Sequence, residues 1–362
     1  MKLGPNVDSF LALVRAGLWA DIESFALKNY GITKPVDWNN VYQLAEEQSV
    51  LGLILAGLEF SNLKPPQELL LQWIGEVQML EQQNKAMNHF IALLVEKMRK
   101  AEDIYTLLVK GQGLAQCYER PLWRVCGDID FLLSDKNYEN AKRFLLPLSS
   151  DHNPEGKYSK HFVMNIEGWL VEIHGSLRTC LSSRIDKQID SARDNVFYGG
   201  NVRLWHNNGT SIFLPSPDND AFLVFTHFLK HFYKEKMNLR QLCDWCRLLW
   251  TYKDSLNREI LELRIRKAGL MREWKAFAVL AVEWLDMPEE AMPFYDVRCK
   301  MSDGRCDKKA ERILKHILKG EPYSKIRDTW AIAKIFPWNT MKFLPSIFFN
   351  VNGLKIKERL FN

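Results

Sequence analysis

The sequence lacks the long hydrophobic runs of a membrane protein and the cysteine spacing of a disulfide framework. No stretch approaches the ~18 apolar residues that a membrane-spanning helix needs, and the apolar run at 343–349 is far too short. The seven cysteines are odd in number and irregularly spaced, which favours reduced thiols in the cytosol. Asp8 and Arg15 interrupt the apolar stretch near the N-terminus, so we expect no signal peptide and a cytoplasmic protein.

Internal repeats, low-complexity segments and a strong net charge are also missing. The net charge of +5 is mild for 362 residues but uneven, because residues 301–362 hold 13 Lys/Arg and 6 Asp/Glu. Such a basic segment can bind nucleic acid, an anionic membrane or a protein partner, although a solvated surface is the simpler interpretation. The length is enough for about two to three domains, and 47% hydrophobic with 26% charged residues is ordinary for a soluble, well-packed protein.

Apolar periodicity divides the chain into helical ends and a β-rich middle. Residues 1–100 follow a period of about 3.6, which predicts a helical N-terminal region. Residues 101–214 carry short apolar and alternating runs that predict strands, and residues 215–330 return to a helical pattern. Residues 331–362 form a basic, aromatic tail whose fold we do not assign. These regions predict an α+β protein, a small mixed β-sheet core flanked by N- and C-terminal helical regions.

Individual elements can be placed within these regions. In the N-terminal region we expect helices from Val7 and from Asp37, and a long helix over 68–100. In the middle region the expected elements are, in order, strand 104–109, helix 114–119, strand 128–133, helix 137–146, a hairpin of 157–166 with 169–177, and further strands within 195–214. In the C-terminal region the expected helices are 218–234, 239–252, 257–285 and 305–319.

Three carboxylates stand out in the predicted strands. Asp128 and Asp130 are two residues apart, so both side chains point to one face of their strand, and Glu172 and His174 likewise share a face. Burying unpaired carboxylates is costly unless a positive group lies beside them. If the two strands are neighbours, Glu172 joins the aspartates, and three hard oxygen donors around one point suit Mg²⁺.

A glycine turn precedes the aspartate strand. Gly111-Gln112-Gly113 lies between a strand end and a helix start, where free backbone N–H groups favour an anion, and Lys110 stands beside it. Nucleotide chemistry requires a phosphate cradle that faces a Mg²⁺ site, because the cation neutralises the triphosphate and aligns it for attack.

The stretch 110–134, KGQGLAQCYERPLWRVCGDIDFLLS, combines strand, glycine turn, helix and a strand bearing DxD, and a later strand supplies a third carboxylate. This pattern resembles the polymerase-beta-type nucleotidyltransferase superfamily. It is most similar to bacterial nucleotidyltransferase family proteins, which also show Lys-Gly at the turn, an arginine four residues before the first aspartate and an acidic residue before Ile-His. Arg124 and Glu172-Ile173-His174 fit that description, as do THFLKHF and NLRQLCDW in the flanking helices. The likeness covers most of 35–250.

The resemblance implies an enzyme that transfers a nucleoside monophosphate from an NTP to an acceptor hydroxyl on a small molecule or a protein. ATP is the NTP that we expect first. Asp128 and Asp130 would bind Mg²⁺, or Mn²⁺ in its place. Glu172 would bind the catalytic metal and help to deprotonate the acceptor. His174, which neighbours Glu172, is an accessory candidate, and a hydrogen-bonded histidine at the sheet edge is an equally good interpretation.

The resemblance also implies phosphate contacts around the turn, made by Lys110, Gly111, Gln112, Gly113 and Arg124. The sequence departs here from the superfamily, whose turn is usually Gly-Ser or Gly-Gly and whose interval to the first aspartate is usually shorter. For Lys110 and Arg124, an ion pair with nearby acids is as good an interpretation as substrate contact.

Two further patterns are weaker. His227 and His231 are four residues apart on one helix, and Cys243 and Cys246 form a CxxC on the next, so the four make a zinc site conceivable, yet both helices read as aromatic-rich core. Arg240 and Asp244 have the spacing of a structural pair on one helix.

Two other function classes stay open at this stage. An RNA-directed nucleotidyltransferase would bind RNA through 301–362 in a salt-sensitive manner, although nucleic acid is not the favoured partner. A catalytically degenerate module would bind a nucleotide or a protein partner, but the intact Asp128, Asp130 and Glu172 argue against it. The sequence does not identify the acceptor, the preferred base or the oligomeric state.

Overall fold

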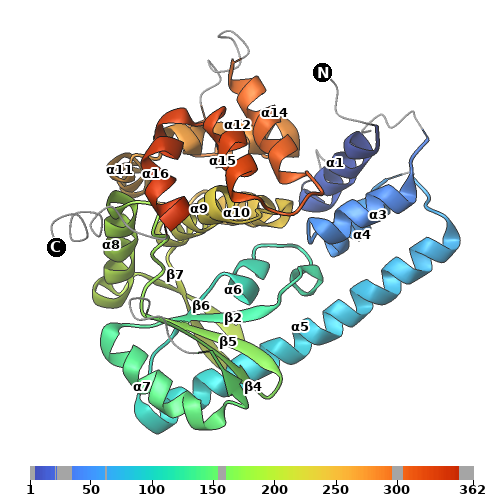
Figure 1. The fold of residues 1–362 in the computed structure, drawn as a ribbon. Helices are drawn as coiled ribbons and strands as arrows, with labels where there is room; N and C mark the ends of the chain where they lie inside the picture. The colour runs from blue at the N-terminus through green and yellow to red at the C-terminus, as the bar shows by residue number, and fades with distance from the viewer. Residues whose placement is uncertain are drawn as a thin grey trace.

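The computed structural model describes residues 5–20, 22, 35–61, 63–153, 160–295 and 305–349. Over these residues it shows an α+β fold, a seven-stranded mixed sheet flanked by helices, as expected (Figure 1). The strands are β1 Leu107–Val109, β2 Asp128–Leu132, β3 Asp151–His152, β4 His161–Ile166, β5 Trp169–His174, β6 Val202–Asn207 and β7 Thr210–Pro215.

The strands lie in the order β3-β4-β5-β2-β1-β7-β6. β2 pairs with β5, and β1 with β7, in parallel, while the other neighbours are antiparallel. The expected hairpin is confirmed as β4 and β5, joined by Glu167-Gly168, both with positive φ. Its first residues, 157–159, lie outside the described part of the chain. The hairpin brings β5 against β2, the strand that carries both aspartates.

The N-terminal helices are α1 Pro5–Leu18, α3 Trp38–Glu47, α4 Leu51–Glu59 and α5 Gln67–Glu102. The long helix expected over 68–100 is confirmed as α5. The single helix expected after Asp37 is instead two, because the chain turns at Ser49, which has a φ of 57°. Apolar periodicity continued across this turn and concealed it, since both helices bury one face in the same core.

Three predicted element boundaries were wrong. Residues 195–199, expected in a strand, end α8 Ser183–Gly199, whose cap Ser182 accepts a hydrogen bond from the N–H of Ile185. The helix expected over 257–285 is α11 Arg258–Ala268 and α12 Met271–Leu285, separated at Gly269, whose φ of 76° ends α11 in a left-handed cap. The short helix expected over 114–119 is α6 Gly111–Ala115.

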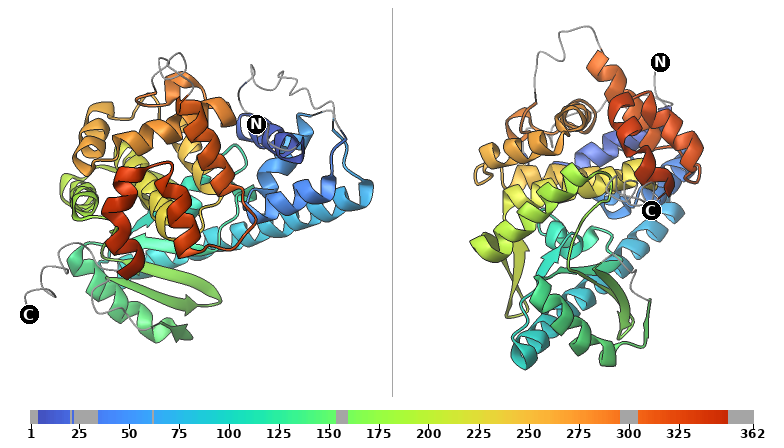
Figure 2. Two further views of the ribbon diagram at one scale, coloured as in Figure 1. Left: turned by 45° about the horizontal axis from the view of Figure 1, so that its top comes forward. Right: turned by 60° about the vertical axis from the view of Figure 1, so that its left-hand side comes forward.

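The other helices are α7 Asp135–Leu145, α9 Pro217–Lys234, α10 Leu239–Thr251, α14 Arg305–Ile317, α15 Lys325–Ala333 and α16 Pro337–Phe349. Figure 2 shows the C-terminal helices as a layer over one face of the sheet. None of the described helices is long and apolar enough to cross a bilayer.

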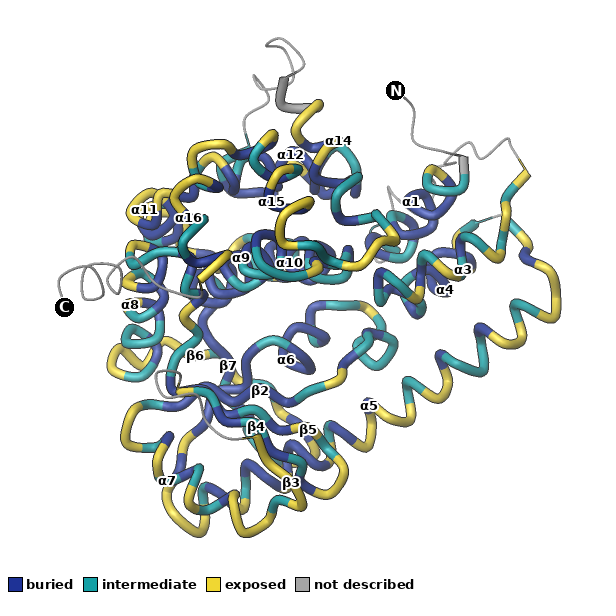
Figure 3. Tube along the Cα trace, in the orientation of Figure 1, coloured by how far each residue is buried: buried dark blue, intermediate teal, exposed yellow. Residues whose placement is uncertain are grey.

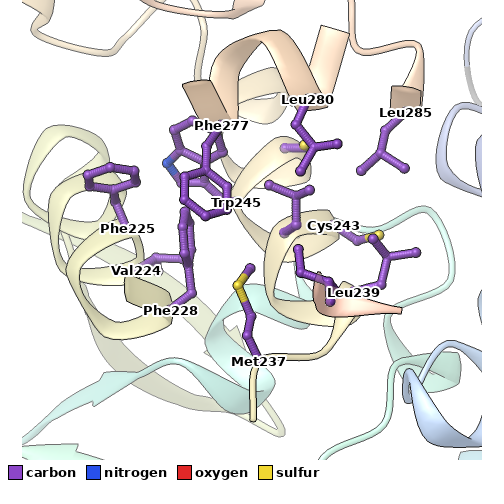
Figure 4. Packing of buried hydrophobic residues seen from close by; sticks show 14 of the residues in the cluster. Val224, Phe225, Phe228, Met237, Leu239, Cys243, Trp245, Phe277, Leu280 and Leu285 are labelled. Atoms are coloured by element: carbon purple, nitrogen blue, oxygen red, sulfur yellow. The ribbon is translucent and has the colours of Figure 1, made fainter. Parts of the chain in front are cut away.

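The largest hydrophobic cluster joins both ends of the chain. Its centre is aromatic: the centroid of the Phe225 ring on α9 lies 5.6 Å from that of Trp245 on α10 (Figure 4). The Phe225 centroid also lies 4.7 Å from that of Trp274 on α12. Phe10 of α1 and Phe343 of α16 are buried in the same cluster. The part of the predicted tail before residue 350 is therefore packed helix, and the remainder lies outside the described residues. The domain boundaries expected at 100, 214 and 330 stay a prediction.

A second cluster fills the opposite face of the sheet. It contains the C-terminal half of α5, the buried face of α7, and the inward residues of β2 and β5, Ile129, Phe131, Val171 and Ile173. Figure 3 shows these buried segments, with the outer face of α5 exposed. Because strand residues alternate, Asp128, Asp130 and Glu172 must point to the other face, toward α6 and the C-terminal helices.

Candidate active site

The three predicted carboxylates come together at the centre of the sheet. Asp130 and Glu172 are direct Cα partners in the parallel pairing of β2 with β5. One carboxylate oxygen from each of Asp128, Asp130 and Glu172 lies within 4.8 Å of the other two. The expectation that the two strands are neighbours and that Glu172 joins the aspartates is therefore confirmed.

Asp130 is the buried centre of this group. Its Oδ1 accepts hydrogen bonds from Lys110 Nζ at 2.8 Å and from His174 Nε2 at 2.7 Å. Burial alone would raise the pKa of Asp130, but the charge of Lys110 and the hydrogen bond from His174 outweigh it and hold that pKa below its usual value. Its buried Oδ2 has no hydrogen-bond partner among the described residues.

The pKa values of the other two carboxylates are shifted in opposite directions. Burial and the neighbouring Asp130 raise the pKa of Asp128. Burial would also raise the pKa of Glu172, but hydrogen bonds from His161 and His174 hold it far below its usual range. Glu172 is therefore a firmly ionised carboxylate and a weak base.

Two stacked histidines hold Glu172. His161 and His174 are Cα partners across the β4–β5 hairpin, and their rings stack with centroids 4.5 Å apart and 6° between planes. His161 Nε2 lies 2.8 Å from Glu172 Oε2, and His174 Nε2 lies 3.5 Å from it. Sequence reasoning passed over His161. Counting back across the two-residue turn from His174 would have found it.

The glycine turn divides between the site and the core. Lys110 and Gly111 line the cavity beside the carboxylates, and both have positive φ. The Gln112 side chain instead turns inward and donates to Asn84 Oδ1 at 2.7 Å, and Gly113 packs against Leu214. The resemblance implied phosphate contacts for all four residues from 110 to 113. In the structure the Gln112 side chain is buried in a hydrogen bond with Asn84 instead.

Arg124 forms an ion pair rather than standing free for phosphate. Its Nε and Nη2 each donate to one oxygen of Asp244 at 2.7 Å, and both residues are buried. Tyr118 also donates to Asp244, at 2.8 Å. The expected pair of Arg240 with Asp244 was wrong, because Arg124 occupies both carboxylate oxygens. Arg240 Nη1 donates instead to the carbonyl of Val125 at 2.6 Å.

Arg240 is a site residue that sequence reasoning missed. It lines the cavity, and its charge acts on Asp128, whose pKa it lowers against the stronger effects of burial and Asp130. Its buried Nε has no partner among the described residues. No local pattern indicates this, because β2 and α10 meet only in the folded chain.

The carboxylates form one wall of a cavity of about 960 Å³ between the sheet and the C-terminal helices. The remaining walls are rich in cations, which are Lys160, Arg178, Arg193, Lys230, Lys234, Lys236 and Arg240. Within the described part of the chain, Lys234, Lys236 and Arg240 have no carboxylate partner; Lys234 donates to Ser346 Oγ at 3.1 Å. The cavity thus pairs an acidic centre with a basic surround.

The conceivable zinc site does not form. Cys243 and Cys246 are buried in the aromatic helical core, where Figure 4 labels Cys243, whereas His227 and His231 line the cavity. Among the described residues, the groups with metal-binding spacing are Asp128-Asp130-Glu172 and His161-Glu172-His174, and neither contains a cysteine.

The residues of the first group fit Mg²⁺. All three donors are carboxylates, which are the hard oxygen ligands that this ion takes in proteins. The unpartnered, buried Asp130 Oδ2 is a polar atom that a cation would satisfy. Asp128 and Glu172 are partly exposed to the cavity, which leaves room for ligands that are not protein.

Comparisons with known proteins identify the family of the chain. The model of a family described as "Uncharacterised nucleotidyltransferase" matches residues 34–286. A search of the curated proteins found no match. Among solved structures, an antigenic nucleotidyltransferase-like protein from Paracoccidioides brasiliensis has 12% identity and a TM-score of 0.33, over 55% of this chain and 92% of that one, a likeness too distant to carry an argument. Because the family match spans most of the chain, the protein belongs to this family of uncharacterised nucleotidyltransferases.

Proposed function

We propose that the protein is a Mg²⁺-dependent nucleotidyltransferase that moves a nucleoside monophosphate from an NTP to a hydroxyl on a small molecule or a protein. ATP is the NTP that we expect first. The observation that carries the proposal is the convergence of Asp128, Asp130 and Glu172 on the wall of a cationic cavity. Family membership supports the same reaction class.

Asp128, Asp130 and Glu172 would hold the cation, with Mn²⁺ as the substitute for Mg²⁺. When bound, the cation neutralises the triphosphate and lowers the pKa of the attacking hydroxyl. Lys110 already neutralises part of the charge on Asp130, and it lies near enough to the cavity to contact a phosphate as well.

The triphosphate would lie against the basic surround. Lys234, Lys236 and Arg240, which lack carboxylate partners among the described residues, are the cations best placed to pair with phosphate oxygens. Gly111 completes this surface beside Lys110, whereas α6 has only five residues and adds little dipole. Arg124 would support the site indirectly. Its ion pair with Asp244 holds α10 in place, and α10 carries Arg240.

The experiment incubates the protein and cell lysate with Mg²⁺ and each of the four α-labelled NTPs. We expect label on a small molecule or a protein with the wild type and with Asp254→Asn, an exposed carboxylate on a distant turn. The variant Asp128→Asn with Asp130→Asn should transfer no label while circular dichroism shows that it remains folded. Transfer that survives this substitution contradicts the proposed site. Label on RNA would instead identify a nucleic-acid acceptor, and absence of label with every NTP would favour a binding module.

A further inference from the structure

His227, His231 and Glu235 form a hydrogen-bonded row on the face of α9 that lines the cavity. His227 and His231 are four residues apart on one side of α9, and Glu235 is the residue that caps the C-terminal end of this helix. His227 Nε2 lies 3.1 Å from His231 Nε2, and His231 Nδ1 lies 2.8 Å from Glu235 Oε2. All three line the same cavity as the carboxylate group. The proposed metal and phosphate contacts use none of them.

The partners in this row fix its proton positions. Glu235, whose pKa the hydrogen bond from His231 lowers to about 2, is ionised and accepts, so Nδ1 of His231 carries a proton. When His231 is neutral, its Nε2 is an acceptor, and Nε2 of His227 donates to it. The remaining nitrogen of His227, Nδ1, is left with a lone pair. A neutral imidazole with one free nitrogen and an oriented partner is the arrangement of a general base.

The surroundings keep His227 neutral near pH 7. Burial lowers its pKa, and the charges of Lys110 on the turn before α6, Lys230 on α9 and His174 on β5 lower it further. His227 lines the same cavity as the carboxylate group.

We propose that His227 is the general base that deprotonates the acceptor hydroxyl, with His231 and Glu235 as positioning residues. This inference rests on the proposed nucleotidyl transfer. The hydroxyl proton passes to Nδ1 of His227 while the hydroxyl oxygen bonds to the α-phosphorus. The bond from that phosphorus to the bridging oxygen breaks, and pyrophosphate leaves with the electron pair. His231 and Glu235 stabilise the imidazolium that results.

The first test needs no activity. In ¹⁵N-histidine-labelled full-length protein, NMR at pH 7 should show His231 protonated at Nδ1 alone and His227 at Nε2 alone. Glu235→Gln should disturb both signals, and His206→Gln, which changes an exposed histidine on β6, should disturb neither. A wild type in which His231 is protonated at Nε2, or in which His227 is doubly protonated, contradicts the relay.

The second test measures label transfer from α-labelled NTP against pH. We expect His227→Gln to slow transfer by about 10²–10⁴-fold, with unchanged affinity for a non-hydrolysable NTP analogue with Mg²⁺. The fall in wild-type rate at acid pH, where His227 takes up a proton, should disappear in this variant, and His206→Gln should match the wild type. If His227→Gln transfers label at the wild-type rate, the role of His227 as general base is wrong, while the proposed nucleotidyl transfer still stands. A wild type without transfer overturns the proposed function, and the relay with it.

Discussion

Asp130 is buried, yet only one of its two carboxylate oxygens has hydrogen-bond partners among the described residues. It is 1% exposed, and one of its oxygens receives two cationic donors while the other receives none from the described residues. Lys110 and His174 keep the carboxylate ionised without a metal, and the open oxygen leaves it able to bind one. The fold therefore tolerates this residue before any ligand arrives.

Arg124 provides a prediction on the structural side of the site. Substituting Arg124→Met leaves Asp244 buried without its cation, which should lower the free energy of unfolding by about 3–5 kcal/mol. Adding Asp244→Leu should recover most of that loss, because two apolar residues then replace a buried ion pair. Urea denaturation measures both. If Arg124→Met leaves stability intact and weakens only nucleotide binding, Arg124 is a phosphate ligand after all.

His316 provides a pH prediction far from the site. Burial against Phe232, followed by the charge of Lys319, lowers its pKa from 6.5 to about 4. A depressed histidine pKa means that the neutral form supports folding, so its contribution is full above pH 6.5 and is lost as the pH falls through 4. We expect this residue to account for about 3 kcal/mol of acid destabilisation, at ~1.4 kcal/mol per pKa unit.

The measurement compares urea unfolding of wild type and His316→Gln at pH 7 and pH 4. The variant should lose about 3 kcal/mol less than the wild type over this interval. The control, His206→Gln, removes an exposed histidine and should follow the wild type. Equal acid losses in wild type and His316→Gln would show that His316 titrates normally.

The residue scale also shows what the sequence can predict. The shared face of Asp128 and Asp130 follows from strand alternation, and Glu172 follows from the same rule on a second strand. The pair of Arg124 with Asp244 joins residues 120 positions apart, so no local rule reaches it. The spacing of Arg240 and Asp244 was misleading, because helical neighbours interact only when no stronger partner is present.

At the scale of elements, α1 and α4 cross at unusually short range. A Cβ on Gly17 would lie 1.9 Å from the carbonyl oxygen of Leu53, and one on Gly57 would lie 2.1 Å from that of Leu13. Both contacts are with backbone, so the helices must separate if a side chain is added. This crossing ties the N-terminal helices to the core that also carries α9 and α10.

Gly57→Ala should therefore lower the free energy of unfolding by about 1–3 kcal/mol, the usual effect of overpacking. Gly75→Ala is the matched control on α5, where a Cβ meets nothing within 4 Å. It should raise the free energy of unfolding by about 0.5–1 kcal/mol. Alanine has fewer backbone conformations than glycine in the unfolded chain, so it loses less conformational entropy when the helix forms. Equal effects at the two positions would contradict the close crossing.

Elements were predictable where one periodicity ran unbroken. α5 and the β4–β5 hairpin satisfy this condition, and the structure confirms both. Boundaries failed at Ser49 and Gly269, where a left-handed residue turns the chain inside a continuous apolar pattern. Residues 195–199 failed because Val196 and its aromatic neighbours have high strand propensity, which the helix-forming start of α8 overrides.

At the scale of the whole molecule, the cavity separates opposite charges into two regions. The acidic group lies on the sheet, and Lys234, Lys236 and Arg240, which have no carboxylate partner among the described residues, lie on or beside the helices α9 and α10. A nucleotide triphosphate with a bound cation has the complementary arrangement, which supports binding between the two layers. The described basic residues that matter here are thus in the cavity rather than in the segment 301–362.

Lys234→Gln with Lys236→Gln should weaken binding of all four NTPs to a similar extent. Each pairing near the surface contributes about 0.2–1 kcal/mol, so for two lysines we expect a loss of about two- to thirtyfold that shrinks at high salt. Lys100→Gln, which removes an exposed lysine on α5, should leave affinity unchanged. A loss confined to one NTP would indicate base recognition instead of phosphate pairing.

The most direct measurement is isothermal titration of a non-hydrolysable NTP analogue into wild type and into Asp128→Asn with Asp130→Asn, each with Mg²⁺ and with EDTA. The account predicts binding only by the wild type and only with Mg²⁺, while circular dichroism shows that both proteins are folded. Equal affinity in EDTA, or equal affinity in the substituted protein, would contradict the claim that these carboxylates present a metal-bound nucleotide.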